Sequence, residues 1–176
     1  MNEQHTDEPS NVREMNLETD FDQVKKIWLH GAKKAHPLIP ENFWDSRLPT
    51  FIKETQNAKE RCVYEEKKCK IRGFITARED GYIFELYVDF REEDFRGRGI
   101  GKVLFETLQG KNPKFPQLID RYSQFTSSVY AHNHKSFAWH IKQDFKVFGI
   151  RFCPDTGLPK FEMIWKKDRR EGARSS

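Results

Sequence analysis

The segment Arg96–Gly101 (RGRGIG) constrains the fold of this chain most, because it joins two apolar stretches that differ in periodicity. Residues 82–90 (YIFELYVDF) are typical of a β-strand, whereas residues 99–109 (GIGKVLFETLQ) carry apolar side chains at the spacing of a helix face. Glycine tolerates the backbone conformations that a tight turn requires. The segment therefore predicts a strand that turns sharply into the first turn of a helix.

This turn has the properties of a phosphate-binding site. The amino terminus of a helix leaves N–H groups without intrahelical partners and carries a partial positive charge. Glycine occupies three of the six positions, so an anion can approach the backbone, and Arg96 and Arg98 add positive charge. The dinucleotide fingerprint would need glycine in place of Leu104, and the Walker loop would need glycine in place of Arg96. We expect a pyrophosphate ligand that belongs to neither a nicotinamide dinucleotide nor a nucleoside triphosphate.

Periodicity divides the rest of the chain into runs of strands and helices. Helices are predicted over residues 20–30, 43–57, 99–109 and 134–144, and strands over residues 12–15, 61–65, 70–78, 82–90, 125–131, 146–152 and 161–165. Residues 110–123 fit neither pattern. Strands and helices that occur in such runs predict an α+β or mixed-sheet layer fold.

We expect one folded domain over residues 12–165, preceded by a disordered tail over residues 1–11 and followed by a basic tail over residues 166–176. The 176 residues contain no internal repeat and no linker rich in proline, glycine or serine. A chain of this length can bury a core that needs no metal or disulfide. The acidic amino terminus and the lack of a long apolar stretch predict a cytoplasmic protein that does not bind membranes.

Charge and cysteine content bear on further classes. The net charge of +4 can steer an anionic cofactor toward the domain, but it is too small for a dedicated nucleic-acid binder. The basic tail also lacks the interleaved aromatic residues that single-strand binders use. Cys62, Cys69 and Cys153 are odd in number and lack metal-ligand spacing, so we interpret them as reduced thiols and expect no metal site.

The surroundings of the glycine segment resemble a known cofactor motif. Residues 85–88 (ELYV), an acidic loop, the pattern RxxGxG over residues 96–101 and an apolar helix are together similar to the coenzyme A-binding motif of the GNAT superfamily of N-acetyltransferases. Asn133 is similar to the family's coenzyme-contacting asparagine, and residues 155–163 (DTGLPKFEM) resemble its closing hairpin. Residues 35–44 (AHPLIPENFW) resemble a bacterial subgroup that includes a peptidyl-lysine acetyltransferase.

The resemblance implies a GNAT-like α+β fold, in which about four helices flank a central mixed, mostly antiparallel sheet of about seven strands. It implies transfer of an acetyl group from acetyl-CoA, a co-substrate used without a metal, to a primary amine of a small molecule or a protein lysine. The residues that it places at the cofactor are Leu86, Tyr87, Val88, Arg96, Gly97, Arg98, Gly99, Ile100, Gly101, Lys102 and Asn133. The first three would stabilise an oxyanion through their main chain.

The catalytic candidates are Glu85 and His140. Glu85 shares a strand face with Tyr87 near the expected thioester and would accept the proton of the amine, although a strand glutamate is as often a solvated or paired charge. His140 lies seven residues after Asn133, where the family commonly has a tyrosine acid, and would protonate the departing thiolate. The alternative is a packing histidine, with Tyr130 or solvent as the acid.

Further departures from the family pattern affect this interpretation. Val88 and Arg96 are eight positions apart, which makes the acidic loop between them an insertion. Ser128 stands where some relatives have a glutamate base. Asp144 stands where the family usually has a glycine that ends the helix before an aromatic residue. The missing tyrosine and glutamate motivate an alternative function, a catalytically weak acyl-coenzyme A-binding regulatory module.

The acceptor pocket is expected between the first two helices. His36 lies in that connection beside a proline, and we expect it to contact the acceptor. Its aromatic neighbours Trp28, Phe43 and Trp44 are spaced as core residues of a helix, which is their more common role. For partners, we expect an amine or a protein lysine as acceptor and no nucleic acid, with a homodimer left open.

Overall fold

The computed structural model describes residues 11–67, 69–89, 91 and 98–168, so the predicted tails lie largely outside the described residues. The elements are β1 (Val12–Glu14), α1 (Phe21–Ala35), α2 (Glu41–Asn57), β2 (Glu60–Lys67), β3 (Lys70–Ala77), β4 (Ile83–Val88), α3 (Ile100–Leu108), the 3-10 helix η2 (Pro116–Leu118), β5 (Gln124–Tyr130), α4 (His134–Lys142), β6 (Lys146–Phe152) and β7 (Pro159–Lys166). Every helix and strand that periodicity predicted is present, and the unclassified stretch holds η2. The helix predicted to end at His30 continues to Ala35.

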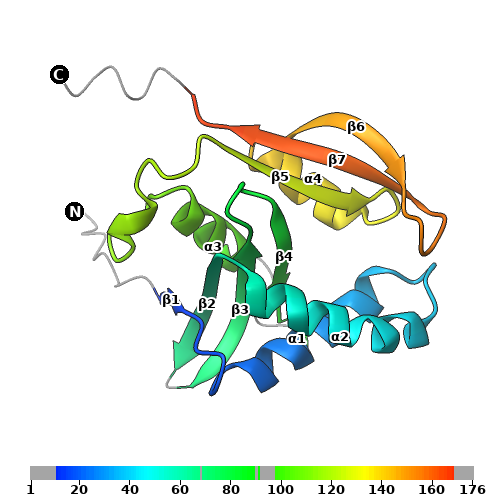
Figure 1. The fold of residues 1–176 in the computed structure, drawn as a ribbon, viewed down its shortest axis with the longest axis horizontal. Helices are drawn as coiled ribbons and strands as arrows, with labels where there is room; N and C mark the ends of the chain where they lie inside the picture. Colours follow the sequence, from blue (N-terminus) through cyan, green and yellow to red (C-terminus); the bar gives the residue numbers. More distant parts are fainter. Residues whose placement is uncertain (1–10, 68, 90, 92–97, 169–176) are drawn as a thin grey trace, which may run out of the picture.

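The strands form two antiparallel sheets instead of one continuous sheet. Within the described residues, the first sheet has the order β1-β2-β3-β4 and the second the order β5-β7-β6. Figure 1 shows the second sheet above the first, with α1 and α2 beside the first sheet and α4 beside the second. The predicted α+β fold with mostly antiparallel strands is therefore confirmed, with the strands divided into groups of four and three.

The first sheet separates two apolar clusters. β3 is buried on both faces from Ile71 to Ala77, as expected for a strand covered on both sides. Because successive side chains of a strand point to opposite faces, Phe74 joins the cluster of Trp28 on α1, whereas Ile75 joins the cluster of Leu104 on α3. Each such side chain contributes about 1.5–3 kcal/mol on full burial. The sheet thus holds α1 and α2 on one face and α3 on the other.

The two sheets meet where β4 begins. The Thr126 N–H donates to the carbonyl of Gly81 at 3.1 Å, and Tyr82 forms a parallel bridge with Thr126. A Cβ at position 81 would lie 2.5 Å from the carbonyl oxygen of Gln124, and the φ of Gly81 is +83°. Both the close approach and the left-handed backbone require glycine here.

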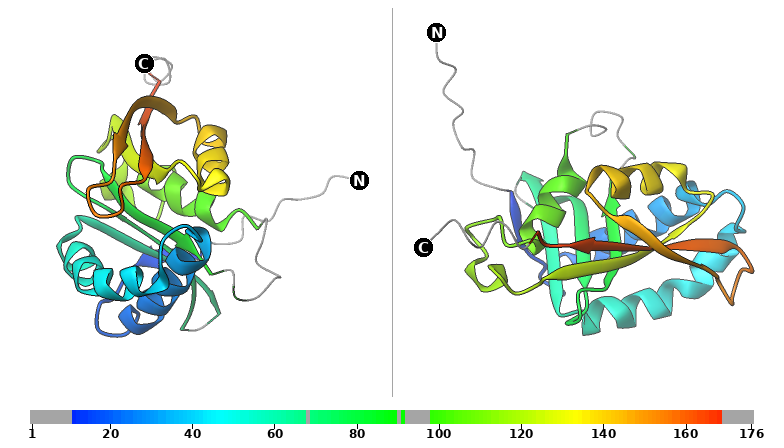
Figure 2. Two further views of the ribbon diagram at one scale, coloured as in Figure 1. Left: turned by 90° about the vertical axis from the view of Figure 1, so that its right-hand side faces the viewer. Right: turned by 90° about the horizontal axis from the view of Figure 1, so that it is seen from above.

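β4 then turns away from β5. Ala77 pairs with Ile83 and Thr76 pairs with Glu85, so Phe84 is an extra residue on β4 that forms a β-bulge. A bulge bends its strand and increases the local twist. Beyond the bulge β4 stays paired with β3, and the described parts of β4 and β5 form no further ladder. The left view of Figure 2 shows the result, with the second sheet above α1 and α2.

The end of α4 shows how a departure from the family pattern is accommodated. Asp144 has a φ of +64°, the left-handed conformation that glycine usually provides after a helix. The Phe145 N–H then donates to the carbonyl of His140 at 3.0 Å, and the Phe145 ring is buried. Aspartate tolerates this conformation better than most residues, so α4 still ends at this point.

The junction at Gly81 can be tested by substitution with alanine. We expect Gly81→Ala to lower the free energy of unfolding by about 2–4 kcal/mol, because the left-handed backbone and the overlap with the Gln124 carbonyl each destabilise the variant. Gly157→Ala is a matched control, since Gly157 has a φ of +69° but a Cβ there would meet nothing within 4 Å. Urea unfolding of both variants would measure the difference, and equal losses would contradict the close contact.

Candidate functional site

A cleft of about 1180 Å³ is lined by residues of α1, α2, β4, α3, β5 and α4 and by the β6–β7 hairpin. The predicted site residues that it brings together are His36, Glu85, Leu86, Tyr87, Val88, Gly101, Asn133 and His140. Arg98, Gly99, Ile100 and Lys102 lie at the beginning of α3 without lining this cleft. Arg96 and Gly97 lie outside the described residues, as does most of the acidic loop.

The free edge of β4 presents main-chain groups to the cleft. The Asp89 N–H donates to the Arg72 carbonyl at 2.7 Å, so the main chain of Asp89 points toward β3. Successive residues of a strand point their main-chain groups in opposite directions. Tyr87 therefore also points toward β3, whereas Leu86 and Val88 point toward the side from which β5 has diverged. Two of the three predicted oxyanion residues thus direct main-chain groups away from β3.

The beginning of α3 fits an anionic group. Gly99 has a φ of +73° in the left-handed region, and its carbonyl accepts a hydrogen bond from the Val103 N–H at 3.0 Å. No side chain of the described residues caps α3, and its first turn has no acidic residue. A Cβ at position 99 would meet no atom of the described residues within 4 Å, so those residues leave space beside the helix amino terminus. An uncapped helix start with open space is suited to a phosphate group.

The positive side chains near α3 have carboxylate partners. Arg98 donates to Glu66 Oε1 at 3.0 Å, and Lys102 Nζ lies 3.8 Å from Glu106. Gly101 has a different role, because a Cβ there would lie 3.4 Å from the indole nitrogen of Trp139 on α4. The phosphate-binding interpretation therefore depends on the main chain at the start of α3 more than on these side chains.

Burial raises the pKa of Glu85 to about 8, and the nearby Glu54 carboxylate adds to this shift. The indole of Trp28 and the cations Lys160 and Arg47 oppose it. A carboxylate with a pKa near the working pH can accept a proton from a reacting amine and release it again to water. The position and the pKa of Glu85 are therefore compatible with the predicted role of general base, which stays a prediction.

Three of these neighbours, Arg47, Glu54 and Lys160, were not predicted from the sequence as site residues. Arg47 and Glu54 are seven residues apart on α2, a spacing of two helical turns that places both on one face. This pattern was visible, but it did not indicate that the face borders a cleft. Burial raises the pKa of Glu54. Lys160 on β7 is paired with Tyr130 on the neighbouring strand β5, and its ammonium nitrogen lies 4.5 Å from the centre of the Tyr130 ring.

His140 is buried, and both of its ring nitrogens have partners. Nδ1 donates to the Ser136 carbonyl at 2.8 Å, so Nε2 is the acceptor for the Ser127 hydroxyl at 3.2 Å. Burial lowers the pKa of His140, and the hydrogen bond to Ser136 opposes this shift. An acid role would require the imidazolium form, which burial disfavours. The acid role stays a prediction, and this geometry also fits the alternative of a packing histidine.

Asn133 and His36 lie at the wall of the cleft. The side-chain oxygen of Asn133 caps α4 by accepting a hydrogen bond from the Ser136 N–H at 3.1 Å, so a ligand contact would use its NH₂ group. His36 stacks on Trp44, and its Nδ1 lies 3.0 Å from Nε2 of His132. Burial, with a smaller contribution from His132, lowers the pKa of His36 to about 4. His36 is therefore neutral at pH 7.

A carboxylate reaches Ser128 from the neighbouring strand. The Ser128 hydroxyl donates to Glu162, which lies directly opposite on β7, at 2.8 Å. Arg151 of β6 also pairs with Glu162. Ser128 and Arg151 line the cleft, so β7 supplies a glutamate behind the position where the resemblance implied one on β5. No sequence pattern indicated this pairing, because it depends on the register between two distant strands.

The described cysteines are free thiols, and Cys153 lines the cleft. Burial raises the pKa of Cys153, but hydrogen bonds with Thr156 and Tyr130 outweigh this effect and lower the pKa to about 7.

Within the described residues, no three histidine, cysteine, aspartate or glutamate side chains are arranged to hold a metal ion. No helix in the described part of the chain is long and apolar enough to span a membrane.

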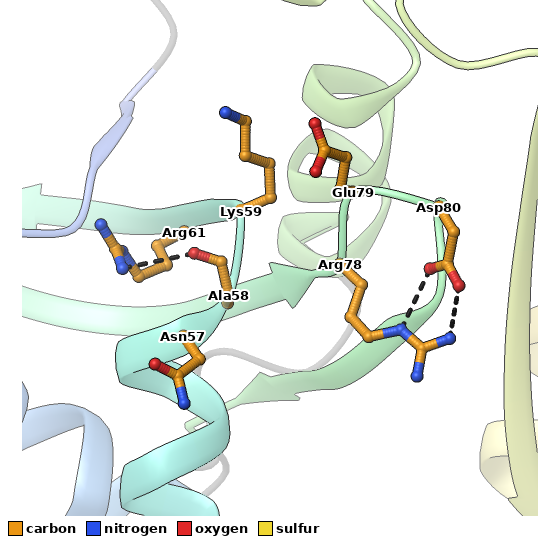
Figure 3. A pocket seen from close by; sticks show the side chains of 7 residues that line it. All are labelled: Asn57, Ala58, Lys59, Arg61, Arg78, Glu79 and Asp80. Carbon is orange, nitrogen blue, oxygen red and sulfur yellow. Dashed lines mark hydrogen bonds and ion pairs between the residues drawn. The ribbon is translucent and has the colours of Figure 1, made fainter.

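A second hollow, of about 580 Å³, lies beside the β3–β4 turn and the end of α2. Figure 3 shows its side chains, in which Arg61 donates to the Ala58 carbonyl and Arg78 pairs with Asp80. None of the predicted site residues lines this hollow. Its two arginines already have oxygen partners, so it offers less to a ligand than the larger cleft.

Comparisons with known proteins identify the fold. No protein-family model and no curated protein sequence matches the chain. Among solved structures, apo YjaB from Escherichia coli is 18% identical with a TM-score of 0.68, covering 88% of this chain and 95% of that one. A GCN5-related N-acetyltransferase structure from Rhodopseudomonas palustris is 15% identical with a TM-score of 0.68, covering 91% of this chain and 97% of that one.

A third similar structure contains a cofactor. The putative acetyltransferase yncA from Salmonella typhimurium, solved with acetyl-CoA, is 14% identical with a TM-score of 0.58, covering 92% of this chain and 96% of that one. These matches cover 88–92% of this chain and 95–97% of the other chains, so the similarity concerns the fold of the whole domain. The chain therefore has the fold of the GNAT superfamily of N-acetyltransferases.

Proposed function

We propose that this protein transfers an acetyl group from acetyl-CoA to a primary amine of a small molecule or a protein lysine. The observation that carries the proposal is the position of Glu85, a carboxyl group with a pKa of about 8, on the strand whose free main-chain edge borders the cleft. A base and main-chain donors side by side are what acyl transfer to an amine requires. The fold, and the acetyl-CoA found in one similar structure, agree with this function.

The cofactor would be held by main-chain groups at two places. The N–H groups at the start of α3, beside Gly99, would bind the pyrophosphate. Main-chain groups of Leu86 and Val88 would hydrogen bond to the pantetheine arm and the thioester carbonyl, and the NH₂ group of Asn133 would contact the same arm. When bound, acetyl-CoA supplies the activated acetyl group. We keep Arg96 and Gly97, outside the described residues, in the proposed phosphate loop.

Glu85 would then remove a proton from the acceptor. An alkylamine with a pKa of about 10.4 is mostly protonated at neutral pH and cannot attack until it loses a proton. The Glu85 carboxylate, directly or through water, would accept that proton. The main-chain N–H groups of Leu86 and Val88 would stabilise the negative charge that develops on the carbonyl oxygen. His140 or solvent would return a proton to the sulfur.

The competing function is an acyl-coenzyme A-binding regulatory module with weak or no turnover. The neutral state of His140 favours this alternative, because it leaves the departing thiolate without a strong acid. Release of free thiol from acetyl-CoA in the presence of an amine panel separates the two functions. Tight binding of acetyl-CoA without thiol release above background would contradict the enzymatic function.

Four further expectations stay predictions. They are the domain bounds 12–165, the cytoplasmic location, the contact of His36 with the acceptor, and the homodimer.

Replacement of Glu85 tests the proposed base. We expect Glu85→Gln to lower kcat/KM by about 10²–10⁴-fold, because glutamine cannot accept the proton. In the unchanged protein, kcat/KM should rise with pH up to about 8, as Glu85 loses its proton. The profile should be measured with an aromatic amine that is already neutral at pH 6, so that the acceptor does not titrate. A rising limb that survives in Glu85→Gln would contradict the assignment.

Substitution of Gly99 tests the phosphate site. We expect Gly99→Glu to weaken coenzyme A binding by at least about tenfold, because it places a negative charge in the space beside the start of α3. Gly99→Ala is the matched control, since it adds the same left-handed backbone cost without the charge. Calorimetric titration with coenzyme A would compare both variants. Equal affinities in the two variants would show that no phosphate binds there.

A His140→Phe variant separates packing from acid catalysis. We expect it to lower the free energy of unfolding by about 1–3 kcal/mol, because the Ser127 hydroxyl and the Ser136 carbonyl lose their partner. If the ring also protonates the thiolate, kcat should fall by about 10²-fold or more. The decline of kcat at high pH, which the loss of the imidazolium proton causes in the unchanged protein, should then be absent from the variant. An unchanged kcat would leave solvent or Tyr130 as the acid. Urea unfolding and thiol release measure the two effects separately.

A further inference from the structure

Lys160 neither binds a ligand nor moves a proton in the proposed chemistry, although its charge opposes the rise in the pKa of Glu85. Its ammonium group borders the cleft above the Tyr130 ring, and no carboxylate in the described part of the chain forms an ion pair with it. Burial lowers the pKa of Lys160, although Cys153 and Glu85 oppose that shift. Burying a charge without an ion-pair partner costs free energy. A ligand with a negative charge would offset this cost by pairing with the ammonium group.

Arg47 faces the same part of the cleft from α2. Its guanidinium lies 3.3 Å from Asp155, and 39% of its side chain is exposed, so it keeps donors for a further partner. Both Arg47 and Lys160 lower the pKa of Glu54 and the pKa of Glu85. The two cations and the two carboxyl groups therefore lie within electrostatic reach of one another.

These groups are arranged to bind opposite charges. In their ionised forms Glu54 and Glu85 attract an ammonium group, and Glu85 is the proposed base for it. Lys160 lies on the second sheet, across from Tyr130, where an anionic group of the same molecule would find a cation. The rings of Trp28, Phe43 and Trp44 line the same cleft and offer apolar contacts to a short carbon chain.

We propose that the acceptor is a primary amine that also carries a carboxylate, with its amine at Glu85 and its carboxylate at Lys160 and Arg47. The inference rests on the proposed acetyl transfer and adds the chemical class of the acceptor. In the reaction the amine nitrogen forms a bond to the acetyl carbon and the carbon–sulfur bond breaks. The ammonium group loses two protons, of which one goes to Glu85 and the other reaches the departing thiolate through His140 or solvent.

Matched acceptors test the proposal. The pair 4-aminobutyrate and n-butylamine differs in the carboxylate, and kcat/KM for each is measured by thiol release from acetyl-CoA. We expect 4-aminobutyrate to be preferred at least about tenfold, a difference of about 1.4 kcal/mol. Equal kcat/KM values would overturn the inference and leave acetyl transfer intact. Absence of thiol release with every amine would instead reject the proposed function.

Variants assign the preference to Lys160. We expect Lys160→Met to reduce the ratio of the two kcat/KM values to near one, because the cation is lost, and Lys160→Arg to retain a ratio above one. Lys146→Met is the matched control, since Lys146 is exposed on β6 and does not line the cleft. A ratio unchanged in Lys160→Met would overturn the assignment. Mass spectrometry that finds acetyl on Lys160 itself would also overturn it, because the lysine would then be an acceptor.

Discussion

The contact between Gly81 and β5 is the constraint on which the rest of the structure depends. It joins the two sheets where β4 begins, and the bulge at Phe84 then bends β4 away from β5. Had the two strands stayed paired, the main-chain groups of Leu86 and Val88 would have been used in a continuous sheet. Because they diverge, the same groups border a cleft that receives side chains from both sheets and from three helices.

Burial makes this cleft chemically active. Carboxyl groups that would be ionised in water lie beside aromatic rings of α1 and α2, so the pKa of Glu85 rises into the range where it can exchange protons near neutral pH. The same surroundings lower the pKa of His36, of His140 and of Lys160. Burial thus favours the neutral forms of these carboxyl, imidazole and ammonium groups, whereas hydrogen bonds lower the pKa of the Cys153 thiol in the same cleft.

Local patterns predicted the elements well, because hydrophobic periodicity and turn residues act over short distances. Each expected helix and strand is present, and the strand–glycine–helix order around Gly99 led to the cofactor class. Element ends were less accurate, as α1 shows by continuing to Ala35. The division of the strands into two sheets was not predicted, because pairing between distant strands leaves no periodic signal within either strand.

The sequence by itself determined the element order, the α+β class and a helix start that can accept a phosphate, since each follows from neighbouring residues. Only the tertiary structure decided which side chains share the cleft. Lys160 and Glu162 acquire their cleft surroundings through the pairing of β7 with β5, which places them opposite Tyr130 and Ser128, and Glu54 reaches the same cleft from α2. The pKa of a side chain depends on burial and on nearby charges, and both are properties of the folded chain.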